Sequence, residues 1–109
     1  MSTMGLRAAI KAAHRSTHET FYHGVAIEKG GALLAIGWNH GEIHAEVHAM
    51  MRIPPEKRRN LTIWSIRITS TGKLSMAKPC VNCEPFLRQF GVKKVMYSTT
   101  NEEILMMRL

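Results

Sequence analysis

Aspartate is absent from the 109 residues, and only two residues are cysteine. Two cysteines are too few for the disulfide framework of a small secreted domain. No apolar run approaches the roughly 18 residues that a membrane helix needs. The basic N-terminal segment MSTMGLRAAIKAAHRS lacks the compact apolar block of a signal peptide. We therefore expect a cytoplasmic protein that does not enter a membrane.

Aromatic residues are also scarce, at 6%, whereas basic residues are in excess and give a net charge of +7. A basic surface suits phosphate-bearing partners, either nucleotides or nucleic acid. The few aromatic residues argue against a surface that stacks a run of bases. Hydrophobic residues at 45% and charged residues at 21% are typical of a globular protein, and residues 1–109 fit one domain.

Hydrophobic periodicity predicts helices and strands in alternation. The expected helices cover residues 4–18, 42–52 and 79–90, and the expected strands cover 22–28, 32–38, 61–69 and 93–98. Pro79 suits the first position of its helix, and Gly91 suits the position after the end of that helix. For the last residues, TTNEEILMMRL, we favour a short strand antiparallel to the preceding one, with an amphipathic helix as the alternative. The order predicts an α/β fold of three layers, α/β/α, around a mixed sheet of 4–5 strands. The strands on either side of the third helix should be parallel.

The two cysteines, Cys80 and Cys83, directly follow Pro79 in the first turn of the third expected helix. Residues three apart share a helix face, so both sulfurs can reach one ion. The positive end of a helix also favours thiolates. Taken alone, the pair could equally be two small core residues or a redox dithiol.

The stretch GEIHAEVHAM, residues 41–50, places His44, Glu46 and His48 close together. In a regular helix the side chains of residues i and i+2 point about 200° apart. His44 and Glu46 can therefore serve one site only if His44 lies where the helix begins. The metalloprotease motif HExxH is excluded because Ala45 separates the first histidine from the glutamate. For His48, a packing role is favoured over a metal-binding role.

Helix N-termini in an α/β sheet gather at the carboxyl ends of the strands, where ligand sites form. His44 from one such end and two thiolates from another make three protein ligands, and a catalytic zinc site keeps its fourth position open. Glu46, which is not a ligand, is then suited to act as a proton shuttle.

This combination is the H-x-E…P-C-x-x-C pattern of zinc nucleobase deaminases. The chain resembles the zinc-dependent cytidine/deoxycytidylate deaminase superfamily, as a compact member. The resemblance rests on GWN at 37–39, HAE at 44–46, PCVNC at 79–83 and FGVKKVMYS at 90–98. It implies a cytidine-deaminase-like fold and one Zn²⁺ per chain bound by His44, Cys80 and Cys83. It also implies that Glu46 carries a proton from the attacking water to the ring nitrogen of the base.

The resemblance further implies substrate contacts. Asn39 matches the asparagine that touches the sugar or base, and the Ala45 backbone amide would contact the base carbonyl. Lys78 departs from the pattern, because many relatives have serine, threonine or glutamate before the Pro-Cys pair, and we expect it to meet a phosphate instead.

Three functions follow as hypotheses. The favoured one is zinc-dependent hydrolytic deamination of cytosine in a free nucleoside or nucleotide, by an enzyme that forms homo-oligomers. The second is deamination of cytosine or adenine in single-stranded DNA or RNA, which the net charge supports. The third is a zinc-stabilised binding module without catalysis, which would have no need of Glu46.

Overall fold

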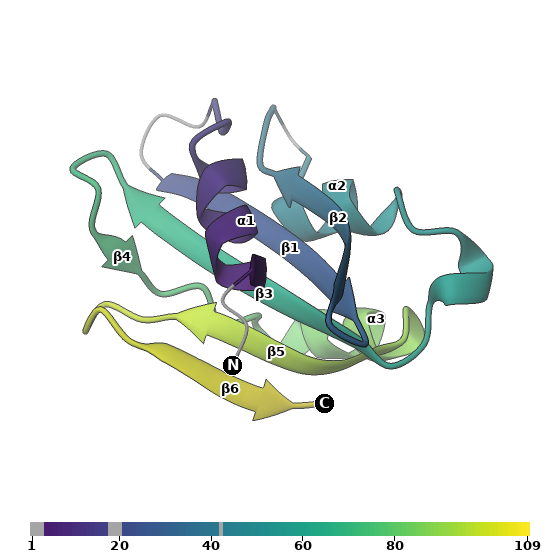
Figure 1. The fold of residues 1–109 in the computed structure, drawn as a ribbon. Helices are drawn as coiled ribbons and strands as arrows, with labels where there is room; N and C mark the ends of the chain where they lie inside the picture. The colour runs from purple at the N-terminus through teal and green to yellow at the C-terminus, as the bar shows by residue number, and fades with distance from the viewer. Residues whose placement is uncertain (1–3, 18–20, 42) are drawn as a thin grey trace.

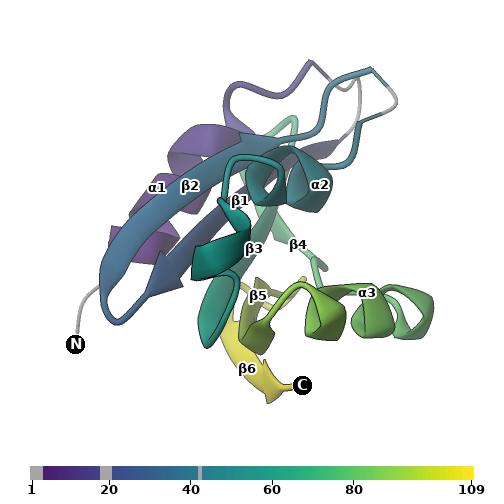
Figure 2. The same ribbon diagram turned by 90° about the vertical axis from the view of Figure 1, so that its right-hand side faces the viewer.

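The computed structural model describes residues 4–17, 21–41 and 43–109. Its elements form three layers (Figures 1 and 2). Helix α1 (Met4–Ala13) covers one face of a sheet, and helices α2 (Ala45–Met50) and α3 (Glu84–Gln89) cover the other. The predicted α/β/α arrangement with a mixed sheet is thus confirmed. Within the described ranges, no helix is long and apolar enough to cross a membrane.

The sheet has the strand order β2-β1-β3-β5-β6, and a short strand β4 pairs with β3 outside this path. The strands are β1 (Phe21–Lys29), β2 (Ala32–Trp38), β3 (Leu61–Thr69), β4 (Leu74–Ser75), β5 (Val92–Ser98) and β6 (Ile104–Arg108). The pair β3 and β5 is parallel, as predicted for strands joined through a helix, and the other pairs are antiparallel. The sheet has one strand more than predicted, because the two-residue β4 forms in a segment for which we predicted neither a helix nor a strand.

The β1–β2 hairpin and the C-terminal strand agree with the sequence. Gly30 and Gly31 have φ values of 57° and 82°. Two consecutive left-handed residues suit the tight turn of a hairpin such as β1–β2. At the C-terminus, β6 pairs antiparallel with β5, which confirms the favoured strand over the alternative helix.

The helices are shorter than the periodicity predicted. Helix α1 ends at Ala13, and α2 starts at Ala45 because His44 is still in an extended conformation. Residues 18 and 42, which bounded two expected helices, lie outside the described residues. The helix expected from Pro79 is also corrected: residues Val81–Cys83 form a 3-10 turn, η2, and the α-helix starts only at Glu84. A second 3-10 turn, η1 (Pro55–Lys57), lies in the basic loop after α2.

Two strand glycines let helices pack directly on the sheet. A Cβ atom added to Gly37 would lie 2.5 Å from the Ala45 carbonyl oxygen and 2.5 Å from the Ala49 nitrogen, both in α2. On the opposite face, a Cβ atom on Gly24 would clash with the backbone of α1. The position of α2, and with it the positions of His44 and Glu46, therefore depends on the missing side chain at Gly37.

Candidate active site

The residues expected to bind zinc lie at the beginnings of helical segments. His44 is the residue just before α2, with φ −74° and ψ 149°, so it is extended while Glu46 is already helical. This confirms the requirement that His44 lies where the helix begins. Cys80 precedes η2 in a similar extended conformation, and Cys83 ends η2 directly before α3.

The two cysteine sulfurs lie 3.1 Å apart. The hydrogen bond that they share lowers the pKa of Cys80. The same hydrogen bond, together with burial and the charges of Cys80 and Glu46, raises the pKa of Cys83 to about 11. A first proton thus leaves Cys80 more readily, and a cation is needed to make both sulfurs thiolates near neutral pH.

The set of donor atoms fits a zinc ion. One imidazole and two thiols are ligands that Zn²⁺ prefers. In the described part of the chain, no three histidine, cysteine or acidic side chains lie close enough together to bind a metal ion. His44 is therefore not within metal-binding distance of the two cysteine sulfurs. The groups still share one region: Glu46 raises the pKa of Cys83, and His44 lowers that of His23. The residues present therefore fit a zinc ion by their chemistry and by their side of the sheet.

The carboxylate of Glu46 is half-buried and faces a histidine that the sequence analysis did not consider. Its Oε1 atom lies 3.2 Å from Nδ1 of His23 in β1. The same Oε1 atom is buried and forms no hydrogen bond of good geometry. His23 is itself buried, with 7% of its surface exposed. The predicted proton shuttle thus lies against a buried ring.

The hydrogen bonds on the far side of His23 assign its proton. Ser65 Oγ lies 3.0 Å from the Ala77 carbonyl oxygen, to which it donates its single hydrogen. His23 Nε2 lies 2.8 Å from the same Oγ atom and must then be the donor of that bond. Burial is the main cause that lowers the pKa of His23 to about 4, so the ring is neutral at pH 7. Nδ1 is then an acceptor, and it can hydrogen-bond Glu46 only when the carboxyl group is protonated.

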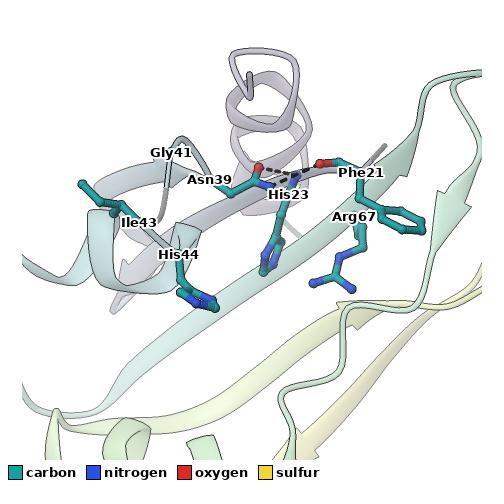
Figure 3. A pocket seen from close by; sticks show the side chains of 7 residues that line it. All are labelled: Phe21, His23, Asn39, Gly41, Ile43, His44 and Arg67. Atoms are coloured by element: carbon teal, nitrogen blue, oxygen red, sulfur yellow. Dashed lines mark hydrogen bonds between the residues drawn. The ribbon is translucent and has the colours of Figure 1, made fainter. Parts of the chain in front are cut away.

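A cavity of about 380 Å³ opens beside these groups. It is lined by Phe21, His23, Asn39, Gly41, Ile43, His44 and Arg67 (Figure 3). The rings of His23 and His44 and the guanidinium of Arg67 come from three elements and point in the same general direction. Phe21 and Ile43 are 38% and 46% exposed and form an apolar part of the rim. The cavity thus combines apolar walls with a few convergent polar groups, as ligand sites do.

Asn39, a predicted substrate contact, lines this cavity and also joins β2 to β1. Its Oδ1 accepts a hydrogen bond of 2.9 Å from the His23 backbone, and its Nδ2 donates one of 3.2 Å to the Phe21 carbonyl. One Nδ2 hydrogen remains for a ligand. Ala45 is buried as the first residue of α2, and Lys78 is exposed. Neither of them lines the cavity, and the substrate contacts of all three residues stay predictions.

His48 packs against Trp38, in agreement with the role favoured from the sequence. Its Nδ1 accepts a hydrogen bond of 3.2 Å from the Trp38 backbone, and its Nε2 lies 3.0 Å from Arg52. The two rings meet edge to face at 4.5 Å between centroids. Both ring nitrogens thus have partners that are not metal ligands.

Two cavity residues, His23 and Arg67, were missed by the sequence analysis. Both lie in strands predicted from apolar alternation, at positions where an apolar residue would be expected to face the core. That mismatch between residue type and strand face was the signal that could have found them.

Comparison with solved structures supports the fold. RibD from Acinetobacter baumannii is similar in its form 1 and form 2, each with a TM-score of 0.62 and 24% sequence identity. The matches cover 87% and 84% of this chain but only 27% and 26% of the RibD chains. The chain thus spans about a quarter of the length of these structures. Comparison with curated protein sequences gives no significant match.

Comparison with protein families identifies the chain more closely. Residues 2–99 match the model described as "Cytidine and deoxycytidylate deaminase zinc-binding region". That range includes His44, Glu46, Cys80 and Cys83, and all the residues that line the cavity. The sequence motifs, the three-layer fold and this match agree, and the chain belongs to the cytidine and deoxycytidylate deaminase zinc-binding region family.

Proposed function

We propose that this protein catalyses the zinc-dependent hydrolytic deamination of a cytosine base in a free nucleoside or nucleotide. Membership of the deaminase family supports the reaction class. The observation that carries the proposal is the position of Glu46, whose Oε1 is held against His23 beside a cavity that His44 also lines. A zinc site that served stability alone would not need a buried carboxylate there.

The metal would be held by His44, Cys80 and Cys83, as one Zn²⁺ per chain. Bound zinc supplies a Lewis acid that makes a water molecule acidic near neutral pH. The two thiolates would balance the formal charge of the ion. This assignment rests on the donor set and on the family, whose description names a zinc-binding region.

Glu46 would take the proton from the attacking water and deliver it to the ring nitrogen of the cytosine. The water oxygen bonds to the amino-bearing carbon, and Glu46 would carry a second proton from the resulting hydroxyl group to the amino group. The carbon–nitrogen bond then breaks, and ammonia leaves with a uracil base as the other product. Between these transfers Glu46 is a carboxylic acid, and the acceptor Nδ1 of His23 is placed to hold its hydroxyl group. Asn39 would orient the substrate with its free amide hydrogen, and Phe21 and Ile43 would cover the base.

The test is release of ammonia by the purified, zinc-loaded protein. The panel comprises cytidine, deoxycytidine, CMP, dCMP, adenosine, guanine and single-stranded oligonucleotides. Glu46→Gln is the matched control because it keeps the side-chain shape, and it should lower kcat by about 10²- to 10⁴-fold with zinc content unchanged. Full activity of that variant would refute the mechanism. A protein that binds zinc tightly but converts no compound would instead be a binding module.

A second candidate is deamination of cytosine or adenine in single-stranded DNA or RNA. The net charge of +7 favours it, because basic surfaces attract polynucleotides. Conversion of oligonucleotides without turnover of any monomer, together with binding that weakens steeply with salt, would support this candidate. We also propose a cytoplasmic homo-oligomer, which analytical ultracentrifugation and fractionation of cells would test.

A further inference from the structure

Arg67 extends a row of inward-facing side chains on β3. Leu61, Ile63 and Ser65 are buried and precede it on the same face of the strand. In the antiparallel register Arg67 lies directly opposite His23. Side chains at opposite positions have Cβ atoms about 5 Å apart, so the guanidinium lies beside the ring that contacts Glu46. A cation therefore occupies the wall of the candidate active site.

One nitrogen of the Arg67 guanidinium has no acceptor among the described residues. Its Nε atom is buried and has no hydrogen-bond partner, and no ion pair joins Arg67 to a carboxylate in the described ranges. Its contact with an aromatic ring is to Phe21, 5.7 Å from the ring centroid. Arg67 as a whole is half-buried, but an unsatisfied donor that is itself buried destabilises a protein. The missing acceptor is explained if a ligand brings it.

The surroundings of Arg67 select the kind of anion. Among the described residues that line the cavity none is acidic, and the other groups there are two imidazoles, an amide and the apolar Phe21 and Ile43. A cavity of about 380 Å³ is in the range of small-molecule sites. Apolar walls suit a planar base, and a guanidinium presents two parallel donors that match phosphate oxygens. The anion that cytosine compounds carry is phosphate.

We infer that Arg67 binds the phosphate group of the substrate, so that the substrate class is a nucleoside monophosphate and not a nucleoside. This inference rests on the proposed function, whose site it completes. It places phosphate recognition inside the cavity, on β3, instead of at the exposed Lys78 that the sequence suggested.

The test compares substrates with and without phosphate in matched variants. Arg67→Gln removes the charge, Arg67→Lys keeps the charge without the two parallel donors, and Arg108→Gln removes one charge from the exposed surface of β6. In the wild-type protein, kcat/KM for CMP or dCMP should exceed that for the nucleoside. Arg67→Gln should lower kcat/KM for the monophosphate about 100-fold, mainly through KM, and change that for the nucleoside by less than about threefold. Arg67→Lys should fall between, and Arg108→Gln should match the wild type.

Equal losses for both kinds of substrate in Arg67→Gln would overturn the inference, because Arg67 would then support the site without reading phosphate. Preference for oligonucleotides over monophosphates would overturn it too. If Arg67→Gln does not fold, the wild-type protein still decides: equal kcat/KM for CMP and cytidine refutes the inference.

Binding of inorganic phosphate, measured by calorimetry, separates this inference from the proposed function. Phosphate binding that Arg67→Gln abolishes, in a protein that deaminates no cytosine compound, would refute the function and support the anion site. Deamination of cytidine as fast as of CMP, with no phosphate binding, would support the function and refute the anion site.

Discussion

Replacing Gly37 by alanine should disable the candidate active site without replacing any of its residues. The added Cβ atom would lie 2.5 Å from the Ala45 oxygen and the Ala49 nitrogen, whereas ordinary van der Waals contact begins at 3.4 Å. Both contacts are with helix backbone, which cannot rotate away as a side chain can. Helix α2 must therefore retreat from the sheet by about 0.9 Å, the difference between these distances. His44 and Glu46 move with it.

The cost of this movement can be estimated for stability and for catalysis. Overpacking by one methyl group costs about 1–3 kcal/mol. Each kcal/mol lowers the melting temperature of a domain of this size by about 4–8 °C. A displacement of catalytic groups by about 1 Å can lower the rate about 10²-fold. We therefore expect a Gly37→Ala protein that still folds, at a lower Tm, and has kcat/KM reduced by about two orders of magnitude.

Gly24→Ala is the matched control, because its Cβ atom would clash with helix backbone on the opposite face, in α1. It should lower Tm at least as much as Gly37→Ala but reduce kcat/KM by less than about tenfold. Thermal unfolding and steady-state kinetics of both variants decide the matter. Equal losses of kcat/KM at equal losses of stability would refute the reasoning, since activity would then follow stability and not the position of α2.

Three further predictions concern His23 and zinc. The amide of His23→Asn would take the place of Nδ1, which faces Glu46, whereas the amide of His23→Gln would take the place of Nε2, which faces Ser65. We therefore expect kcat to fall about tenfold in His23→Asn and about 100-fold in His23→Gln. Equal losses of kcat in the two variants would contradict a role of His23 toward Glu46. Burial lowers the pKa of His23 from 6.5 to about 4 in the folded protein, so the unfolded chain binds a proton at a higher pH than the folded protein does. The free energy of unfolding of the metal-free protein should therefore fall by about 3 kcal/mol as pH falls from 6.5 to 4. Urea unfolding should show this loss of stability in the wild type and not in His23→Asn. The same dependence of stability on pH in both proteins would refute the assignment to His23. Removal of zinc by a chelator should lower both Tm and activity, and Cys83→Ser should show the same losses without a chelator. Added zinc should restore the wild type but not the variant. An unchanged Tm after chelation would refute a zinc site that stabilises the fold.

Much of the fold followed from local patterns. The alternation in LTIWSIRIT marks a strand, and the glycine pair at 30–31 marks a hairpin turn, because backbone preferences act within a few residues. The ends of the helices were less predictable. Pro79 favoured an early start for α3, but the chain first forms the 3-10 turn η2 around Cys80 and Cys83. Helix ends depend on tertiary packing as much as on propensity.

The residues of the candidate site also divide into those that the sequence predicts and those that only the structure reveals. His44, Glu46, Cys80 and Cys83 could be identified from the sequence because their spacing along the chain is itself the chemical signal: a ligand before a helix, a carboxylate two residues later and a pair of thiols three apart.

His23 and Arg67 had no such pattern. His23 precedes Glu46 by 23 positions, and it meets that carboxylate only because β1 packs beneath α2. Arg67 lies beside His23 only because of the register between β1 and β3, which a shift by one residue would turn to the opposite face. The sequence by itself determined the family and predicted the metal ligands and a proton shuttle, because these depend on short spacings along the chain. The buried His23 beside Glu46 and the Arg67 cation in the cavity wall depend on which distant strands lie side by side, and strand pairing is set by the packing of the whole sheet.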